Sequence, residues 1–474
     1  MLGHGSRAPS GTNHLHTMTM ISNRFRAVAF LLPLAFTACS SDAGRGSGGG
    51  GGEGGGEGTV CASSAECGGT DVCVDGACGP RPDGWQLGIG DGTAASVGVT
   101  FIYAPDSPRE TTDIAFDPSH ENRLWVLMRE YESSDPCGEQ VATPEGCSSL
   151  EGSTAIIDNP GTDAASVQVI KDPNAWHFMR RPTGIAFGAG QTFATCGEAR
   201  TGNFTDNSID YMGPSLWSSD LAIYGIQPPG LNGSHLDMLH QTPFCMGIAH
   251  QNDNVYWVFN GNAGAIDKVD FQGDHGPGQD DHSNGEYFRY VLGQVARVPN
   301  VPSHLAFHQP SGKLYIADTG NGRIVRLDTQ TGSMGPQITP LYDPIDPAVQ
   351  MDGAVLEDVV PSGTLQQPSG LTVAGDVLFA SDYATNVIYA FDLDGTLLRT
   401  LQIELPPGSV TGLTLGPDEL LYFTEKPTGT VYRIEPILCR LRDGRHGESR
   451  WVARRRRRTR VRLRARRHRH LRAR

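Results

Sequence analysis

Hydrophobic and polar positions alternate in short runs between residues 302 and 328, and turn residues separate the runs. Ser303 to Phe307 is an apolar run after a proline, and Leu314 to Ala317 is a second run after a Pro/Gly turn. Residues 318–322 end the second run, and Ile324 to Leu327 forms a third. Short β-rich runs bounded by Gly, Pro and Asn predict antiparallel strands joined by tight turns.

The same succession of apolar run, turn and apolar run recurs at five other places in the chain. Aligned on the residue after the Ser, Thr or Met that opens each copy, the repeats stand at positions 113, 184, 247, 304, 370 and 412. The shortest interval fits one four-stranded unit of ~40–50 residues, and the longer intervals carry loop insertions. Six copies predict an all-β, six-bladed β-propeller, because radial closure removes long exposed sheet edges.

The repeats also resemble a known family. The pattern P-x-G-[IL]-A-[VF] followed by [LV]-Y-[IV]-A-D-x-x-x-N-x-[IV] is similar to the NHL repeat, and Pro302 to Asp328 is a close copy. The resemblance runs from Thr112 to Pro436 and implies a propeller domain, which we place at residues 90–437. It implies no single function, since propellers of this type include binding scaffolds, lyases and lactonases.

The first 39 residues have the features of an export signal. Arg24 and Arg26 precede an apolar run from Ala27 to Phe36, which is shorter than the ~20 residues needed to span a bilayer. The end of the run resembles a bacterial lipobox, which implies a lipid anchor on Cys39. Cleavage near Ala38 without lipidation is the alternative. We expect an exported lipoprotein of the outer membrane, periplasm or cell surface.

Two low-complexity or cysteine-rich segments follow the leader. Residues 40–59 are almost entirely Gly, Ser, Glu and Asp, which cannot bury a core, so a disordered tether is expected. Residues 60–80 form a small module for which two disulfides are expected in an exported protein, with zinc as the alternative. Its four cysteines are Cys61, Cys67, Cys73 and Cys78. The spacing does not choose their connectivity.

Two further cysteine pairs lie in the propeller region. Cys137 and Cys147 bracket a Gly/Pro-rich insertion, and we expect them to close it into a loop. Cys196 and Cys245 lie at positions in neighbouring blades and form a second candidate bridge. Export favours structural disulfides over reactive thiols at both places.

Charge is distributed unevenly along the chain. The formal net charge is -14, yet residues 440–474 hold 17 arginines and only two carboxylates. The remaining body is therefore strongly acidic, which argues against nucleic acid as a partner. The segment 438–474 is expected to be disordered, and either a shifted reading frame or a basic arm accounts for it. We expect a monomer.

The first candidate site is the mouth of the propeller channel. In this repeat, the residues that precede each innermost strand share a face with the residues that end each second strand. His304 belongs to the first group, and the second contains Glu198, Asn260, Asp318, Asp382 and Glu425. A ring of carboxylates suits Ca²⁺, with Asp318 and Asp382 as ligands. The alternative is that these carboxylates accept hydrogen bonds from the backbone of the next turn.

The second candidate site is the segment 274–285, whose His275, Asp281 and His282 form a weaker set of metal ligands. A solvated polar loop is the alternative. Residues 266–271 and 287–292 read as the third and fourth strands of one blade. The loop between them then lies on the face opposite the mouth, so its histidines are not expected to share a metal with His304, unless the loop folds across the rim.

One position of the repeat, directly after the opening proline, bears on which class of enzyme this chain could belong to. The chain is similar to the amidating-lyase propellers, whose zinc-binding histidines directly follow the opening proline, but Thr183, Ser303 and Ser369 occupy those positions here. Three protein ligands for catalytic zinc are therefore missing from that position. We expect a module that binds a small ligand or a protein at the cell envelope. The alternative is a metal-dependent hydrolase or lyase using Ca or Zn at the channel mouth.

Overall fold

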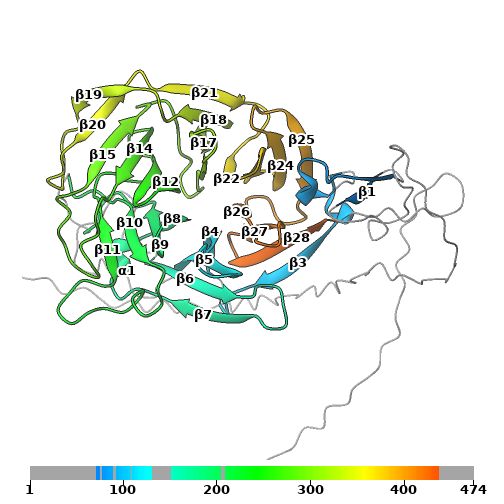
Figure 1. The fold of residues 1–474 in the computed structure, drawn as a ribbon, viewed down its shortest axis with the longest axis horizontal. Coiled ribbons are helices and arrows are strands. Elements are labelled where there is room, and N and C mark those ends of the chain that lie inside the picture. Colours follow the sequence, from blue (N-terminus) through cyan, green and yellow to red (C-terminus); the bar gives the residue numbers. More distant parts are fainter. Residues whose placement is uncertain are drawn as a thin grey trace, which may run out of the picture. The chain divides into compact units, whose positions relative to one another are not determined.

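The repeated runs form six radial β-sheets, or blades, in the computed structural model of the chain (Figure 1). The structure describes residues 71–74, 77–88, 92–107, 109–130, 151–203 and 209–436. Blades are numbered here by the order of their innermost strands in the chain. The predicted all-β, six-bladed propeller is confirmed.

Blades 1 to 3 each begin at the centre of the ring and proceed outward. Their strands are, for blade 1, β4 (Glu110–Phe116), β5 (Arg123–Glu130), β6 (Glu151–Asp158) and β7 (Ser166–Ile170); for blade 2, β8 (Pro182–Phe187), β9 (Thr192–Gly197), β10 (Ser215–Ser218) and β11 (His235–Met238); and for blade 3, β12 (Cys245–Asn252), β13 (Val255–Asn260), β14 (Ala265–Asp270) and β15 (Glu286–Tyr290).

Blades 4 to 6 repeat the same order, except that the outermost strand of blade 6 comes from the start of the domain. Their strands are, for blade 4, β16 (Leu305–His308), β17 (Lys313–Asp318), β18 (Arg323–Asp328) and β21 (Val355–Val360); for blade 5, β22 (Pro368–Ala374), β23 (Val377–Asp382), β24 (Val387–Asp392) and β25 (Leu397–Gln402); and for blade 6, β26 (Val410–Leu415), β27 (Leu421–Glu425), β28 (Thr430–Pro436) and β3 (Val97–Tyr103).

The ring closes where the two ends of the domain meet. Strand β3 pairs antiparallel with β28, with Tyr103 opposite Val431, so one blade combines segments more than 300 positions apart in the printed sequence. The innermost strands of consecutive blades lie side by side, and β26 completes the ring by lying against β4. Closure leaves no unpaired blade within the described ring, which is the usual way a propeller protects its edges.

An insertion in blade 4 extends the neighbouring blade. Between β18 and β21 the chain forms β19 (Ser333–Gln337) and β20 (Ala348–Asp352), which pair with each other. Strand β20 also pairs in parallel with β15, so blade 3 is six strands wide. The hairpin therefore ties blade 4 to the outer edge of blade 3.

The core consists of apolar layers between neighbouring blades. Trp125, Trp217 and Trp257 are fully buried, and the Trp125 ring lies 4.9 Å from that of Phe193 in the next blade. Hydroxyl groups near the ring centre add bonds between blades: the Thr183 hydroxyl donates to the Cys245 carbonyl at 2.7 Å. Paired sheets bury their apolar faces in this way, and the buried polar groups find partners in the adjacent blade.

Short elements complete the described structure. A hairpin of β1 (Val72–Val74) and β2 (Ala77–Gly79) has Cys73 opposite Cys78, and Cys78 is disulfide-bonded. The helical turns are η2 (Trp85–Leu87), η3 (Ala94–Ser96), α1 (Ala175–Phe178) and η4 (Thr319–Asn321). None of the helices in this described part has the length and hydrophobicity needed to cross a membrane. The leader with Cys39, the tether, the Arg-rich tail and Cys61, Cys67, Cys137 and Cys147 lie outside the described residues.

Candidate functional site

The innermost strands enclose a cavity of about 220 Å³ at the centre of the ring. Most of the residues that line it have apolar side chains, such as Ile185, Ile248 and Leu371, but the surface that they expose to the cavity is mostly polar. Asp113 and His304 are the ionisable side chains among its lining residues. The other lining residues follow this repeat position along their strands, so the Asp–His pair lies at the end of the cavity nearer the face where the innermost strands begin. That face is called the first face below.

The repeat explains why only two side chains enter the centre at this level. The other four copies carry glycine at the same position: Gly184, Gly247, Gly370 and Gly412. A Cβ on Gly247 would collide with the Ser303 carbonyl, and one on Gly370 with the Thr411 carbonyl. Glycine lets neighbouring innermost strands approach closely. Blades 1 and 4 stand opposite each other in a ring of six, so their side chains meet across the channel.

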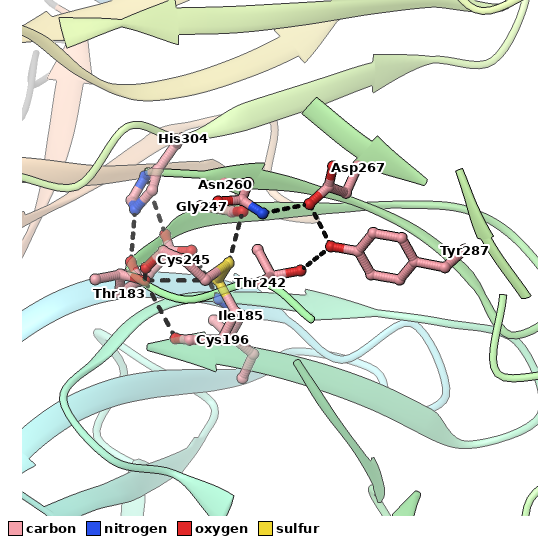
Figure 2. Close-up of a disulfide and its surroundings, with 11 residues drawn as sticks. Thr183, Ile185, Cys196, Thr242, Cys245, Gly247, Asn260, Asp267, Tyr287 and His304 are labelled. Atoms are coloured by element: carbon pink, nitrogen blue, oxygen red, sulfur yellow. Dashed lines mark hydrogen bonds and ion pairs between the residues drawn. A yellow bond between two sulfur atoms is a disulfide. The ribbon is translucent and has the colours of Figure 1, made fainter. Parts of the chain in front are cut away.

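His304 is fixed on both sides by partners from other blades. Its Nε2 donates to the Thr183 carbonyl at 2.9 Å, and its Nδ1 lies 3.6 Å from Oδ1 of Asp113 (Figure 2 shows His304 and Thr183). Both residues are buried. The Asp113 carboxylate also accepts the amide protons of Ile114 and Ile185. Because Nε2 holds a proton for Thr183, any proton between the two side chains belongs to Nδ1 or to the carboxylate.

Burial raises the pKa of Asp113, and His304 and the two amide donors offset this only in part. A buried carboxylate favours its protonated form when the surrounding positive charge is insufficient. The 3.6 Å between Nδ1 of His304 and Oδ1 of Asp113 is too long for a direct hydrogen bond. A hydroxyl or amide group beside the pair could hydrogen-bond to both side chains.

The mouth of the channel at the first face contains a cation of the chain itself. Arg129 is the last residue but one of β5, the second strand of blade 1, and is fully buried. Its guanidinium donates to the Pro182 carbonyl at 2.9 Å and to Asn300 at 2.7 Å. It also lies 3.5 Å from Glu198 and 3.6 Å from Glu110. The arginine thus links blades 1 and 2 to the segment before blade 4, and it supplies the positive charge that a ring of acids requires.

The predicted acids at this face each have their own partners. Glu198 accepts from Arg297 at 2.7 Å, and Asp318 pairs with Arg323 at 2.8 Å. Asp382 accepts backbone amides, including that of Ala384 at 3.0 Å. Glu425 accepts a hydrogen bond from Tyr432, and Asn260, the amide at this position in blade 3, donates one to Asp267. These carboxylate oxygens are used within the protein, and His304 lies deeper in the channel with Asp113.

A disulfide joins blades 2 and 3 beside the channel. Cys196 lies one residue before the end of β9 in blade 2 and Cys245 begins β12 in blade 3, with Cα atoms 5.6 Å apart (Figure 2). The Thr183 hydroxyl binds the Cys245 carbonyl, and the Thr183 carbonyl binds His304. The candidate bridge between neighbouring blades is therefore present. It holds the wall of the channel next to the Asp–His pair.

The loop at residues 271–285 lies along the outer edge of blade 2. The backbone amide of His275 donates to the carbonyl of Leu236, which belongs to the edge strand β11. His282 donates from Nδ1 to Asp237 at 2.9 Å. Asp281 is exposed and accepts from Ser283 instead. The loop histidines therefore contact residues of the outer strand of blade 2, whereas His304 contacts residues in the channel. Asp281 bonds to Ser283 instead of to these histidines.

More histidines from other loops meet this edge. Rings of His235, His275, His282 and His240 lie within 5.1 to 5.5 Å of a neighbour in the group. His240 also contacts His177 through their Nε2 atoms at 3.4 Å and hydrogen-bonds to Asp343 of the β19–β20 hairpin. Burial and the neighbouring His240 lower the pKa of His177 to about 4. We call these five rings the rim histidines.

Sequence reasoning missed Asp113, Arg129 and His235. The alignment contained a signal for Asp113, because it occupies the same repeat position as His304 while the other copies have glycine. Arg129 lies near the end of a second strand, one residue beyond Met128, which occupies the place of Asp318, Asp382 and Glu425 in blade 1. His235 had no such signal, since it lies in a segment that the repeat does not cover.

Comparisons with known proteins give only distant structural neighbours. No protein family and no curated protein matches this chain. The virginiamycin B lyase of Staphylococcus aureus is 12% identical with a TM-score of 0.41, covering 72% of this chain and 99% of that one. An auxiliary nutrient binding protein of Bacteroides ovatus is 11% identical with a TM-score of 0.45, covering 72% and 76%. A luciferin-regenerating enzyme is 13% identical with a TM-score of 0.44, covering 72% and 96%. Such low identities transfer no activity, because one fold supports many functions.

Proposed function

We propose that this protein binds a small ligand in the central channel of an NHL-type propeller, with a hydroxyl or amide group of the ligand hydrogen-bonded to both Asp113 and His304. The observation that carries the proposal is the 3.6 Å separation of these two buried side chains in the wall of a 220 Å³ cavity. A concave apolar site with few convergent polar groups is the usual form of a ligand pocket.

The cavity suggests the size and chemistry of the ligand. Its volume is below the ~300–1,000 Å³ of pockets for drug-sized molecules, so a small molecule fits better. Residues such as Ile185, Ile248 and Leu371 can contact an apolar part of such a ligand. A polar group that reaches both Asp113 and His304 replaces the water that would otherwise bridge a separation longer than a hydrogen bond.

The geometry favours binding over hydrolysis. A general base needs a free nitrogen within hydrogen-bond reach of the proton it removes. In His304, Nε2 already donates to Thr183, and Nδ1 faces Asp113. The oxygens of Asp318 and Asp382 at the mouth are also occupied, by Arg323 and by backbone amides. A metal-dependent hydrolase or lyase therefore has less support than a binding module.

A thermal-shift screen with named probes tests this proposal. Cyclohexanol, δ-valerolactone and benzamide each combine an apolar body with one polar group. A probe that binds the folded protein stabilises it by roughly 2.7 kcal/mol at a hundredfold excess over its dissociation constant. Asp113→Asn should weaken that effect, and Ala186→Leu should abolish it by filling the cavity. Ala222→Leu on an exposed loop is the matched control. A shift that survives Ala186→Leu would place the ligand elsewhere.

We further propose that the propeller acts at the cell envelope, exported by its leader and held by a lipid on Cys39, with residues 40–59 as the tether and the cysteine module at residues 60–80 between tether and propeller. The support is the order of segments in the sequence. Cys39→Ser should move the protein from the detergent phase to the aqueous phase in a partition assay. A wild-type protein that already partitions into water contradicts the anchor.

A further inference from the structure

Three of the rim histidines offer ring nitrogens to one common point. One nitrogen from each of His235, His275 and His282 lies within 4.8 Å of the other two. His235 begins the edge strand β11, and the other two belong to the loop that joins β14 to β15. Backbone bonds hold this loop on the strand, including one from the Gly278 amide to the His235 carbonyl at 2.8 Å. The convergence therefore follows from backbone pairing as well as from side-chain orientation.

The hydrogen bonds of these rings fix which nitrogen is available. Nδ1 of His235 donates to the Asn232 carbonyl at 2.9 Å, and Nδ1 of His275 donates to the Gly276 carbonyl at 2.8 Å. Nδ1 of His282 donates to the Asp237 carboxylate at 2.9 Å. Each ring thus presents Nε2. Metal-binding histidines are held in the same way, by a carbonyl or carboxylate that accepts the other ring proton.

The site also contains buried atoms that lack partners. Within the part of the chain that the structure describes, Nε2 of His235, Nε2 of His275 and Oδ2 of Asp237 are buried and make no hydrogen bond. The side chains of Asp237 and His275 are 0% and 6% exposed. Buried lone pairs that face one another are costly unless a cation lies between them.

We propose that His235, His275 and His282 form a binding site for a divalent transition metal ion, for which zinc is the natural probe. Three imidazoles suit zinc, copper or nickel better than calcium or magnesium, which prefer oxygen ligands. A tetrahedral site with ~2.0–2.1 Å bonds has its ligand atoms ~3.3 Å apart, so the three nitrogens, now within 4.8 Å of one another, would move closer around the ion. Asp237 is the outer partner that orients His282, and Asp281 takes no part.

The site is independent of the ligand cavity in the channel. Its three ligands join a loop of blade 3 to the edge strand of blade 2, so a bound ion would clamp the loop onto that strand. Three protein ligands leave one tetrahedral position open for water or another donor. The site therefore adds a metal-dependent clamp to the outer edge of the propeller, whatever the channel binds.

Zinc titration of the full-length, EDTA-stripped protein tests the proposal. We expect one zinc ion per chain by calorimetry that is lost in His275→Gln/His282→Gln, together with a higher Tm when zinc is bound. Co²⁺ should give the visible bands of a tetrahedral nitrogen site. The double variant should lose more than ~100-fold in affinity, and Asp237→Asn should lose ~10–100-fold, as for other outer partners.

The matched control is His250→Gln/His308→Gln, which removes two histidines bound to Asp253 and Ser311 in other places. This control should bind zinc as the wild type does. Circular dichroism and metal-free melting show whether each variant folds. Equal zinc affinity in both double variants, or no stoichiometric binding by the wild type, overturns the proposal.

Discussion

The central channel and the outer edge of blade 2 both gather ionisable side chains, but they are built in different ways. In the channel, Asp113 and His304 occupy the same position of the repeat in opposite blades, and the symmetry of the ring brings them together. At the edge, His235 and His282 meet because an insertion folds back on a neighbouring blade. The repeat creates the first site, and departures from the repeat create the second.

The two regions also differ in how their charges are satisfied. The channel mouth balances its acids with Arg129 and other cations of the chain. The outer edge contains buried nitrogens without partners and one fully buried carboxylate, Asp237. A region that is already neutralised needs no ion, whereas convergent lone pairs are completed by one. This difference supports our two proposals, an organic ligand at the centre and a metal ion at the edge.

The largest expected effect comes from the covalent link beside the channel. Cys196→Ala/Cys245→Ala should lower the free energy of unfolding by about 4 kcal/mol, because the bridge closes a loop of 49 residues in the unfolded chain. Urea denaturation measures the change. Zinc affinity at the outer edge should stay the same. A simultaneous loss of zinc binding would show that the two regions are coupled through the junction of blades 2 and 3.

Removal of the cation at the channel mouth should be slightly less costly. Arg129→Met leaves Glu110 and Glu198 buried without their shared partner, and we expect a loss of about 3 kcal/mol. Lys426 and Arg297 still pair with these acids, which limits the effect.

The control for Arg129→Met is Arg326→Met, whose ion pairs with Glu357 and Asp394 lie at the surface. Exposed pairs contribute less than ~1 kcal/mol, so this variant should change the urea midpoint little. Equal losses for the two arginines would mean that the mouth network does not stabilise the fold.

Acid should destabilise the rim through His177. Its pKa is about 4 in the folded protein against 6.5 as the ordinary value, so the neutral ring is favoured by folding. This stabilisation is fully present above pH ~6.5 and is lost as the pH falls towards ~4, to a limit of about 3 kcal/mol.

The test for His177 compares denaturation of wild type and His177→Asn between pH 7 and 4, in the presence of a chelator. Asn keeps a donor for the Gly202 carbonyl, which His177 binds through Nδ1. The stability difference between the two proteins should shrink as the pH falls. A difference that is constant across this range contradicts the buried neutral ring.

The smallest effect is expected at Asp281. It is exposed and bonds only within its own turn to Ser283 among the contacts described. Asp281→Ala should leave both Tm and zinc affinity unchanged within error, in contrast to Asp237→Asn. Calorimetry on the two variants side by side distinguishes the buried carboxylate from the exposed one. A strong loss of zinc affinity in Asp281→Ala would show that Asp281 belongs to the metal site and would contradict our assignment.

Much of the fold was predictable because the repeat is local in sequence. The alternation of apolar runs and turns identified six copies, and all six innermost strands lie where the pattern placed them. The loop after β14 was also expected between the third and fourth strands of its blade, and it is there. Such features depend on residues a few positions apart, and each copy supports the same assignment.

The sequence by itself determined the number of blades and the position of His304 at the start of an innermost strand. Only the tertiary structure decided that Asp113 lies opposite His304 and that Arg129 enters the mouth. It also decided that His235 meets the loop with His275 and His282. The physical reason is that ring closure and loop packing join segments far apart in the chain, and their contacts depend on shape and hydrogen bonding rather than on a periodic pattern.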